Sequence, residues 1–364
     1  MRAIKKIVCL GLNGRGGTLH YASSLTSNLA ELTKTSLLLP SYSDTSLISK
    51  KVNIIKIKAP PSAIKTIFLT FNIFQHIKAI KQINKERPDI INILDIHPWY
   101  IMYWHFLKTK KKVVTINDPE LHSGEAGPVM TLLLKTITKF LLKNADEIIV
   151  LGKKQEETIR RLGYKQKVIV SRIGHYDFFM KKSKKKFKSE SSTILFFGRI
   201  KEYKGLDYLL DALIQLKKEG KKFKCIIAGE GDIKPYKEKI AKLKENIELN
   251  NGYISDDKVS EYFQRVGFVV MPYTDATQTG VIQVAYSFGK PVIATNVGSL
   301  PELIEDGKTG LIIEKKNVVQ LKKAIIKLLS NDPKLSEMKI QCRKFMKKLS
   351  WKEITKKLYK DLNS

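Results

Sequence analysis

The sequence predicts an α/β protein built from two doubly wound parallel sheets, one in each half of the chain. Short apolar strands alternate with amphipathic helices over residues 5–118, and a second series of the same kind begins at residue 193. Such alternation places parallel strands in one sheet with helices on both faces. The chain has 364 residues, 43% of them hydrophobic, which is enough for two full-sized cores.

In the first half, each expected strand is a short run rich in Val, Ile and Leu, and each expected helix is amphipathic. A helix between two strands would carry the chain back to start the next parallel strand. These elements form the first domain, residues 1–179. The expected strands cover 5–12, 35–40, 52–59, 89–96 and 112–118, and the expected helices lie near 18–33 and 63–85.

The second half repeats this organisation over residues 193–345. Between the halves lies MKKSKKKFKSESS, residues 180–192, which is polar and is the best linker candidate. A solvated loop and a lipid-facing basic patch are the two readings of this linker. A last helix is expected within residues 346–364, closing the second domain or crossing back to the first. The expected strands cover 193–199, 224–230, 246–254, 268–273, 290–296 and 310–314.

The formal net charge is +31 and is spread evenly along the chain. Residues 1–180 carry 28 Lys and Arg against 13 Asp and Glu, and residues 181–364 carry 38 against 22. Few aromatic residues accompany the basic runs and no recognised nucleic-acid-binding motif is present, so we expect no nucleic-acid partner. Two explanations stay open: a lysine- and isoleucine-rich source genome, or attraction to anionic lipid headgroups.

The cysteines and the apolar segments predict a cytoplasmic protein. Cys9, Cys225 and Cys342 are few, odd in number and far apart, which fits neither a disulfide framework nor a structural zinc site. The apolar run of the first strand is too short for a signal peptide. The most apolar helix candidate, residues 64–80, is shorter than the roughly 20 residues that span a bilayer, so we expect no membrane-spanning segment.

Residues 193–230 carry the strongest chemical signal. An apolar strand runs into Gly198 and Arg199, and after a short loop Lys204 stands before an amphipathic helix. Glycine lets the backbone approach a phosphate, the two cations neutralise it, and the helix N-terminus adds unpaired amides. We therefore predict a diphosphate site whose cations are Arg199 and Lys204.

The first half holds a weaker glycine signal. Gly14, Gly16 and Gly17 follow the first strand and precede a helix, so their amides are placed to meet an anion. A tight connection without a ligand is the alternative. The sequence GLNGRGG lacks the spaced glycines and the later acidic residue of the dinucleotide fingerprint, so we do not expect nicotinamide chemistry.

All six histidines lie in the first half of the chain. Asp95 precedes His97 by two positions, Asp118 precedes His122 by four, and His175 opens GHYDFF near the domain junction. A nearby carboxylate can orient an imidazole for proton transfer or for a hydrogen bond to a substrate hydroxyl, and a structural role is the alternative for each. Neither HxxxH nor paired-cysteine spacing is present, so we predict no metal site.

Further candidates stand at the ends of the later strands. Ligands bind outside the carboxyl ends of parallel strands, so two such domains that face each other would enclose a deep cleft. A helix expected after residue 278 would point its free amides into that cleft as a second phosphate site. The candidates at these strand ends are Glu230, Tyr253, Tyr273, Thr279, Gly280 and Val281.

Several segments of the second half occur in a familiar order: GRIKEYKG, IIAGEGD, MPYTDATQTGVIQVAYSFGKPVIATNVGSLPELIEDGKTGLI and SWKEITKKLY. The first half adds GRGG, TINDPELHSGE, ADEIIVLGKKQEE and the GHYDFF junction. Together these segments resemble the family-4 retaining glycosyltransferases of the GT-B fold. The resemblance implies two Rossmann-like domains and transfer of a sugar from a nucleotide diphosphate donor to an acceptor, with the anomeric configuration retained.

The resemblance also assigns roles to matching residues. The family's motif Arg and Lys, which hold the donor diphosphate, correspond to Arg199 and Lys204 beside Gly198. Asp118 and His122 would position the acceptor or the transferred sugar, and His97 is an acceptor candidate. The matching donor-binding positions are the glycine turn at Gly16 and Gly17, the helix-opening amides of Thr279, Gly280 and Val281, and the base site near Tyr253 and Ile254.

The chain departs from the family pattern at two glutamates that usually flank the last glycine turn, one on the donor sugar and one on the ribose. Counting back from the GKP sequence at residues 289–291, these positions hold Ala276 and Val284. Three readings stay open: hydrogen bonds from Asp275, Gln278 or Gln283 replace the carboxylates, the donor is held differently, or catalysis is weak.

A second departure concerns the family's His-Asp pair, which is Asn117-Asp118 here and leaves His122 as the nearer imidazole. The inferred mechanism needs no protein nucleophile. The acceptor hydroxyl attacks the anomeric carbon on the face that the diphosphate leaves and passes its proton to a leaving phosphate oxygen. Arg199, Lys204 and the helix termini would stabilise the departing charge.

The acceptor is expected to bind the first domain and to be a saccharide or a lipid-linked molecule of surface polysaccharide or glycolipid synthesis. The helix near 63–85 combines bulky apolar residues with lysines, so it either lies on the inner face of the membrane or is a buried crossover helix. A non-catalytic GT-B protein is the main alternative function. An epimerase or hydrolase is disfavoured because no acid/base pair of carboxylates is evident.

Overall fold

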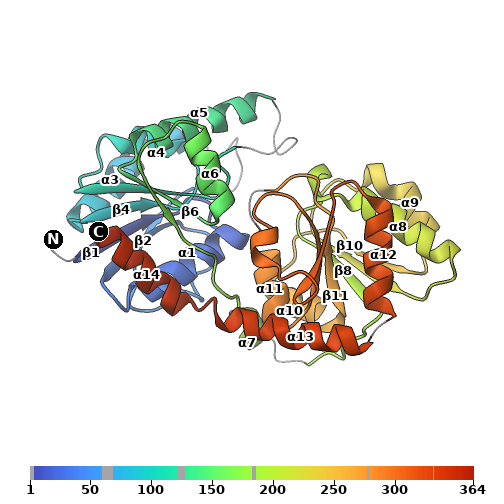
Figure 1. Ribbon diagram of the computed structural model, residues 1–364. Coiled ribbons are helices and arrows are strands. Elements are labelled where there is room, and N and C mark those ends of the chain that lie inside the picture. Colours follow the sequence, from blue (N-terminus) through green and yellow to red (C-terminus); the bar gives the residue numbers. More distant parts are fainter. Residues whose placement is uncertain (1–3, 60–68, 121–127, 183–185, 277–278, 331) are drawn as a thin grey trace. The chain divides into compact units, whose positions relative to one another are not determined.

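The computed structural model describes residues 4–59, 69–120, 128–182, 186–276, 279–330 and 332–364 (Figure 1). The described chain divides into two compact units. Unit 1 comprises residues up to 120, residues 128–173 and residues 351–364, and unit 2 comprises residues 174–350. Each unit contains one parallel sheet, so the chain has the α/β class that the sequence predicts.

The sheet of unit 1 has the order β3-β2-β1-β4-β5-β6-β7, and every described pairing in it is parallel. The order reverses at β1, which lies between β2 and β4. In a doubly wound sheet, the carboxyl ends of the strands at such a reversal form the ligand-binding edge. The strands are β1 (Lys6–Leu10), β2 (Lys34–Pro40), β3 (Asn53–Ile57), β4 (Ile90–Ile93), β5 (Lys111–Ile116), β6 (Glu147–Val150) and β7 (Lys167–Val170).

The helices of unit 1 cover both faces of this sheet. Right-handed crossovers place the helix between β1 and β2 on one face and the helices between β3 and β7 on the other. The last helix of the chain packs beside the first one. The helices are α1 (Gly16–Leu29), α3 (Ile73–Lys85), α4 (Trp99–Trp104), α5 (Pro128–Asn144), α6 (Lys153–Arg161) and α14 (Trp351–Asn363).

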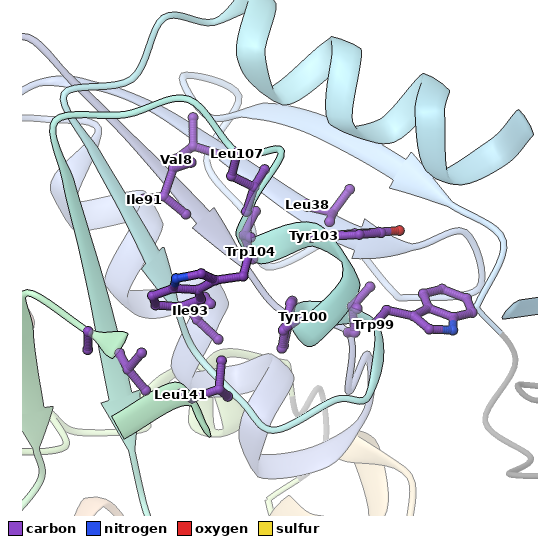
Figure 2. Packing of buried hydrophobic residues seen from close by; sticks show 14 of the residues in the cluster. Val8, Leu38, Ile91, Ile93, Trp99, Tyr100, Tyr103, Trp104, Leu107 and Leu141 are labelled. Atoms are coloured by element: carbon purple, nitrogen blue, oxygen red, sulfur yellow. The ribbon is translucent and has the colours of Figure 1, made fainter. Parts of the chain in front are cut away.

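The core of unit 1 is centred on the aromatic residues of α4. Trp99, Tyr100 and Tyr103 are almost completely buried, and Trp104 is only 5% exposed. Figure 2 shows the Trp104 ring beside aliphatic side chains of the sheet, such as Ile93. Four aromatic residues within six positions let a very short helix bury a large apolar area, which compensates for its weak intrinsic stability.

Helix α14 belongs to unit 1, although unit 2 precedes it in sequence. Its buried residues include Trp351 and Leu358, and the Trp351 ring meets the Tyr21 ring of α1 edge to face at 5.7 Å. The hydroxyl of Tyr359 donates to the carbonyl oxygen of Ile4 at 2.7 Å. The end of the chain is therefore tied to the strand that begins unit 1.

Unit 2 contains a sheet of order β10-β9-β8-β11-β12-β13, again with parallel pairings. The reversal point is β8, which lies between β9 and β11. An α-helix occupies each connection from β8 to β12, and the connection from β12 to β13 contains a short 3-10 turn, Pro301–Leu303. The strands are β8 (Thr193–Phe197), β9 (Lys224–Ala228), β10 (Ile247–Asn250), β11 (Phe268–Met271), β12 (Val292–Thr295) and β13 (Gly310–Ile313). The helices are α7 (Phe178–Lys182), α8 (Leu206–Lys218), α9 (Lys237–Lys242), α10 (Asp256–Arg265), α11 (Val281–Ser287), α12 (Val318–Leu329) and α13 (Asp332–Lys347).

The structure refines several element boundaries that the sequence predicts. Helix α1 begins at Gly16 and ends at Leu29, so the glycine turn forms its first turn. Helix α3 begins at Ile73, and residues 63–68 of the helix expected at 63–85 lie outside the described residues. Strand β10 ends at Asn250, before Tyr253. None of the described helices is long and apolar enough to cross a membrane.

Candidate active site

The carboxyl edge of β8 places Gly198 and Lys204 against each other in unit 2. Gly198 has φ +107°, a conformation that glycine adopts freely, and a Cβ atom there would lie 3.1 Å from the Lys204 Nζ. The loop then closes through a short 3-10 turn ending at Lys204 and enters α8 at Gly205, which has φ +71°. The predicted motif is therefore a tight loop in which the Gly198 backbone lies against the Lys204 side chain.

Lys204 is nearly buried, at 8% exposure, and its ammonium group is held by Tyr273. The Nζ atom donates a hydrogen bond to the Tyr273 hydroxyl at 3.0 Å and lies 4.8 Å from the centre of the same ring. The Tyr273 carbonyl oxygen in turn accepts a hydrogen bond from the Thr295 hydroxyl at 2.6 Å. A buried ammonium group with remaining donor capacity at a sheet edge is suited to binding an anion.

The loop after β9 packs directly on the loop after β8. The amide of Ile200 donates to the carbonyl oxygen of Glu230 at 2.7 Å, and Ile200 forms an isolated parallel bridge with Gly231. A side chain at Gly229 would collide with the Gly198 carbonyl, and one at Gly231 would collide with the Ile200 carbonyl. Glycines are required here because two backbones touch.

The other predicted donor-binding residues of these loops lie nearer to solvent. Arg199 and Glu230 are exposed. Tyr253 is 66% exposed and Ile254 is half-buried, both in the loop between β10 and α10. An exposed tyrosine at the carboxyl edge is available to stack on a planar ring.

In the predicted phosphate-binding turn at α11, a side chain of the turn itself already accepts a hydrogen bond from one of the backbone amides. The Thr279 hydroxyl accepts a hydrogen bond from the Val281 amide at 3.2 Å, so the expectation that this amide is free is wrong. Gly280 is the N-cap of α11 and packs on Tyr176, whose ring a Cβ atom would approach to 3.1 Å. Thr279 thus satisfies one of the donors that a short helix leaves open.

The two positions where the sequence lacks carboxylates are apolar and buried, with Ala276 and Val284 each 6% exposed. Their neighbour Gln283 is 1% exposed, and neither its amide nitrogen nor its amide oxygen has a hydrogen-bond partner in the described part of the chain. Burying an unsatisfied amide costs about 1–3 kcal/mol. Gln278, the other replacement candidate of similar chemistry, lies outside the described residues.

In unit 1, the glycine turn after β1 opens helix α1 without a side-chain cap. Gly16 has φ +56°, which favours glycine, while Gly17 is exposed with open space where a Cβ atom would stand. The first turn contains no acidic residue. The guanidinium group of Arg15 lies over the ring of Tyr42, 5.0 Å from its centre. An uncapped helix start beside an arginine attracts anions.

Asp95, at the carboxyl end of β4, holds the chain before this turn. Its two carboxylate oxygens accept hydrogen bonds from the Asn13 amide at 2.5 Å and the Tyr100 hydroxyl at 2.7 Å. Burial raises the pKa of Asp95 to about 6, against these hydrogen bonds that lower it. The sequence suggests Asp95 as the partner of His97, whereas in the structure it braces the glycine turn.

His97 is 9% exposed and neutral near pH 7. Its Nδ1 accepts a hydrogen bond from the Trp99 amide at 3.2 Å, which leaves the proton on Nε2 as a donor. Burial, and to a lesser degree the nearby His76 imidazole, lowers the pKa of His97 to about 4. A neutral imidazole whose Nε2 carries a proton can donate to a hydroxyl or carbonyl oxygen.

The other predicted residues of unit 1 are only partly described. Asp118 follows β5 and is half-buried, while His122 lies outside the described residues. The side-chain oxygen of Asn117 is buried without a partner in the described chain, and its main-chain carbonyl accepts from Gln155. Across the described residues, no group of three or more His, Cys, Asp or Glu side chains has the arrangement of metal ligands.

Within each unit, the structure brings together part of the predicted set. Unit 2 joins Gly198, Lys204 and Tyr273 directly, and the bracing by Asp95 joins the glycine turn to β4 in unit 1. Sequence reasoning missed the bracing role of Asp95, because only the parallel pairing of β1 with β4 sets it beside Asn13. It also missed the pairing of Tyr273 with Lys204, which are 69 positions apart.

Two family models match the chain. The model described as Glycosyltransferase Family 4 matches residues 15–172, and the model described as Glycosyl transferases group 1 matches residues 191–331. An uncharacterized glycosyltransferase of Methanocaldococcus jannaschii is 32% identical over 179 residues, which cover 46% of this chain and 48% of that protein. The chain thus matches about half the length of this relative.

Solved structures give the same fold over the whole chain. A sucrose-phosphate synthase from Thermosynechococcus elongatus has a TM-score of 0.77 at 18% identity, covering 98% of this chain and 99% of the other. Anabaena HepE, solved in complex with UDP-glucose, has a TM-score of 0.75 at 15% identity with coverage of 98% and 99%. With the matched family models and the two parallel sheets, these findings show that the chain belongs to the family-4, group 1 glycosyltransferases of the GT-B fold.

Proposed function

We propose that this chain is a retaining, metal-independent hexosyltransferase or related glycosyltransferase whose donor is a nucleotide-diphosphate sugar. The observation that carries the proposal is the Lys204 ammonium group, which is buried at the carboxyl edge of β8 between Gly198 and Tyr273. Desolvation makes such a cation a stronger partner for a diphosphate than an exposed lysine. The solved HepE complex with UDP-glucose supports a donor of this class.

The proposed reaction uses the donor's own phosphate as the base. The acceptor hydroxyl attacks the anomeric carbon on the face that the diphosphate leaves, the bond to the phosphate oxygen breaks, and the hydroxyl proton passes to that oxygen. Lys204 and Arg199 stabilise the charge that develops on the leaving diphosphate. The uncapped start of α1 at Gly16 and Gly17 and the α11 turn at Gly280 supply further amide donors.

The proposed acceptor is a saccharide or a lipid-linked molecule of surface polysaccharide or glycolipid synthesis. His97 Nε2 and Asp118 are the unit 1 groups that we assign to its hydroxyls. We place the enzyme in the cytoplasm, peripheral to the inner face of an anionic membrane, with no nucleic-acid partner. Three free, buried cysteines support a reducing compartment.

The test is a thermal-shift titration with UDP-, GDP- and TDP-sugars, on the native protein and on Arg199→Ala. We expect a rise of a few degrees with one donor, because a ligand that binds only the folded state stabilises it. The Arg199→Ala protein should lose that shift while keeping its own melting temperature, since Arg199 is exposed. If no sugar nucleotide produces a shift in the native protein, the donor assignment is wrong.

A non-catalytic GT-B protein that binds a nucleotide or a partner transferase is the second candidate. Ala276 and Val284 favour it, because both replace carboxylates of the family pattern with buried apolar side chains. The unsatisfied amide of Gln283 beside Val284 favours binding of a sugar nucleotide in either candidate, because a donor hydroxyl would satisfy it. If the protein binds a sugar nucleotide but releases no nucleoside diphosphate with any acceptor preparation, it is the non-catalytic protein.

A further inference from the structure

Helices α3 and α5 of unit 1 share an unusual distribution of exposed side chains. The first half of each exposed face is apolar: Phe74 is 85% exposed, Val129 is 84% exposed and Leu132 is 68% exposed. The second half of each face is basic. Together these side chains form the α3–α5 surface. Its apolar residues are Phe71, Ile73, Phe74, Ile77, Val129, Leu132 and Leu133, and its exposed lysines are Lys78, Lys81, Lys85, Lys135, Lys139 and Lys143.

The two helices lie on the same face of the unit 1 sheet, with α4 packed against both. His76 of α3 hydrogen-bonds to the Tyr103 hydroxyl of α4 at 2.7 Å, and Trp104 of α4 meets the Phe140 ring of α5 at 5.8 Å. Both helices follow strands and therefore begin at the carboxyl edge of the sheet. Their apolar halves lie toward that edge, and their lysines lie toward the opposite one.

The charge of this surface is of one sign. Neither α3 nor α5 contains an acidic residue. The six lysines form no ion pair within the described residues. By contrast, Lys239 in unit 2 bridges Asp207 and Asp211, as expected for an ordinary solvated helix. Basic residues next to exposed aromatic and aliphatic side chains match the chemistry of an anionic membrane interface, where both kinds of group find partners.

We propose that the α3–α5 surface docks unit 1 on an anionic lipid bilayer, with its apolar residues at the headgroup boundary and its lysines on the headgroups. A second copy of the chain is a poorer occupant, because an isologous interface would set lysines against lysines. Docking would bring a lipid-linked acceptor to the carboxyl edge of unit 1. Only this delivery of the acceptor rests on the proposed function; the docking itself does not.

The test is co-sedimentation of the full chain with phosphatidylcholine vesicles, with and without about 30% phosphatidylglycerol. The native protein should bind the anionic vesicles, more weakly as salt rises. Phe74→Ser with Leu132→Ser should weaken this binding about 100-fold, roughly tenfold for each apolar side chain. Lys78→Gln with Lys81→Gln should weaken binding about 25-fold, roughly fivefold for each charge.

Matched controls lie in unit 2. Val319→Ser removes a 55% exposed apolar side chain, and Lys221→Gln with Lys222→Gln removes two exposed lysines. Both controls should bind vesicles like the native protein. Every substituted side chain is exposed, so all variants should keep the native melting temperature and the donor-induced thermal shift. The unchanged shift separates a failure of docking from a failure of the proposed donor site.

Three results would overturn the inference. One is a native protein that binds neither kind of vesicle. Another is equal vesicle binding by the native protein and by both double variants of the α3–α5 surface. The third is self-association of the native protein without lipid binding, abolished by Phe74→Ser with Leu132→Ser, which would assign the surface to a second copy.

Discussion

At the scale of single residues, the contact between Lys204 and Tyr273 determines what the second unit can bind. The Lys204 side chain is nearly buried, and its ammonium group uses one of its three N–H donors in the hydrogen bond to the Tyr273 hydroxyl. A buried ammonium group is costly unless it is paired. Donor binding would supply that pairing, which is why this residue outranks the exposed Arg199 as the anchor of a diphosphate.

Replacing Lys204 by Ala should lower kcat/KM for sugar transfer by about 100-fold or more, because it removes a desolvated cation from the leaving diphosphate. The fold should persist, since the substitution also removes a buried charge. The measurement is initial-rate kinetics beside a circular dichroism melt. Lys221→Ala, on an exposed lysine at the opposite edge of the sheet, is the control and should retain native kinetics. Native activity in Lys204→Ala would refute the site.

Asp95 gives a pH-dependent signature in the first unit. Its pKa in the folded protein, about 6, is above the ordinary 3.8 because of burial, so the folded state binds the proton more tightly than the unfolded state. The stabilisation from that proton is complete below about pH 4 and is lost as pH rises through 6. The loss is on the order of 3 kcal/mol.

Asp95→Asn isolates this effect, because an amide of the same shape does not titrate. Between pH 4 and 7, the free energy of unfolding of the native protein should fall relative to that of the variant, measured by urea titration at each pH. At low pH the two proteins should have similar stability, because a protonated carboxyl and a carboxamide each offer a carbonyl oxygen to the Asn13 amide and a donor to the Tyr100 hydroxyl. Parallel pH profiles would show that Asp95 titrates normally.

At the scale of elements, the loops at the carboxyl edge of unit 2 depend on backbone contacts that only glycine permits. Gly205 has φ +71°, and a Cβ atom there would collide with the Pro272 carbonyl oxygen. The neighbouring Thr274 amide donates to the Tyr203 carbonyl oxygen at 2.7 Å. The loops after β8 and β11 are thereby held together, which brings Tyr273 to Lys204.

Gly205→Ala should therefore destabilise the protein by more than its backbone conformation alone explains. Gly220 is the matched control, because it has φ +68° and a Cβ atom added there would meet nothing within 4 Å. Gly220→Ala should cost about 1–2 kcal/mol for the left-handed conformation, and Gly205→Ala clearly more because of the collision. Urea unfolding measures both, and equal costs would contradict the packing argument.

The sequence predicts these elements well where one residue type determines the local structure. Alternating apolar runs locate five of the seven unit 1 strands and all six strands of unit 2, and Gly198 and Gly205 mark the β8 loop. The short strands β6 and β7 are not among the predicted strands. Sequence reasoning does less well where contacts between distant segments determine a side chain's partners. It pairs Asp95 with His97, while in the structure Asp95 is hydrogen-bonded to Asn13 and Tyr100. It also leaves Val281 with a free amide, which the Thr279 hydroxyl occupies.

At the scale of the whole molecule, the chain leaves unit 1 after residue 173 and returns to it at Trp351. The returning helix is part of the core of unit 1. The Lys111 ammonium group donates to the Leu362 carbonyl oxygen at 3.1 Å, and the Ile4 amide donates to the Asn363 side chain at 2.9 Å. The last helix thus fastens β5 and the start of β1, so the two units differ in their dependence on the end of the chain.

Deleting residues 351–364 should unfold unit 1 and spare unit 2. The deletion removes the buried side chains of Trp351, Leu358 and Leu362, each worth about 1.5–3 kcal/mol, from a unit whose total stability is on the order of 5–15 kcal/mol. Hydrogen exchange should show lost amide protection in β1 and β2 and native protection in β8 and β9. Leu358→Ala, expected to cost about 2–5 kcal/mol, should weaken protection in unit 1 by an intermediate amount. Native protection of β1 in the truncated chain would show that unit 1 folds without its last helix.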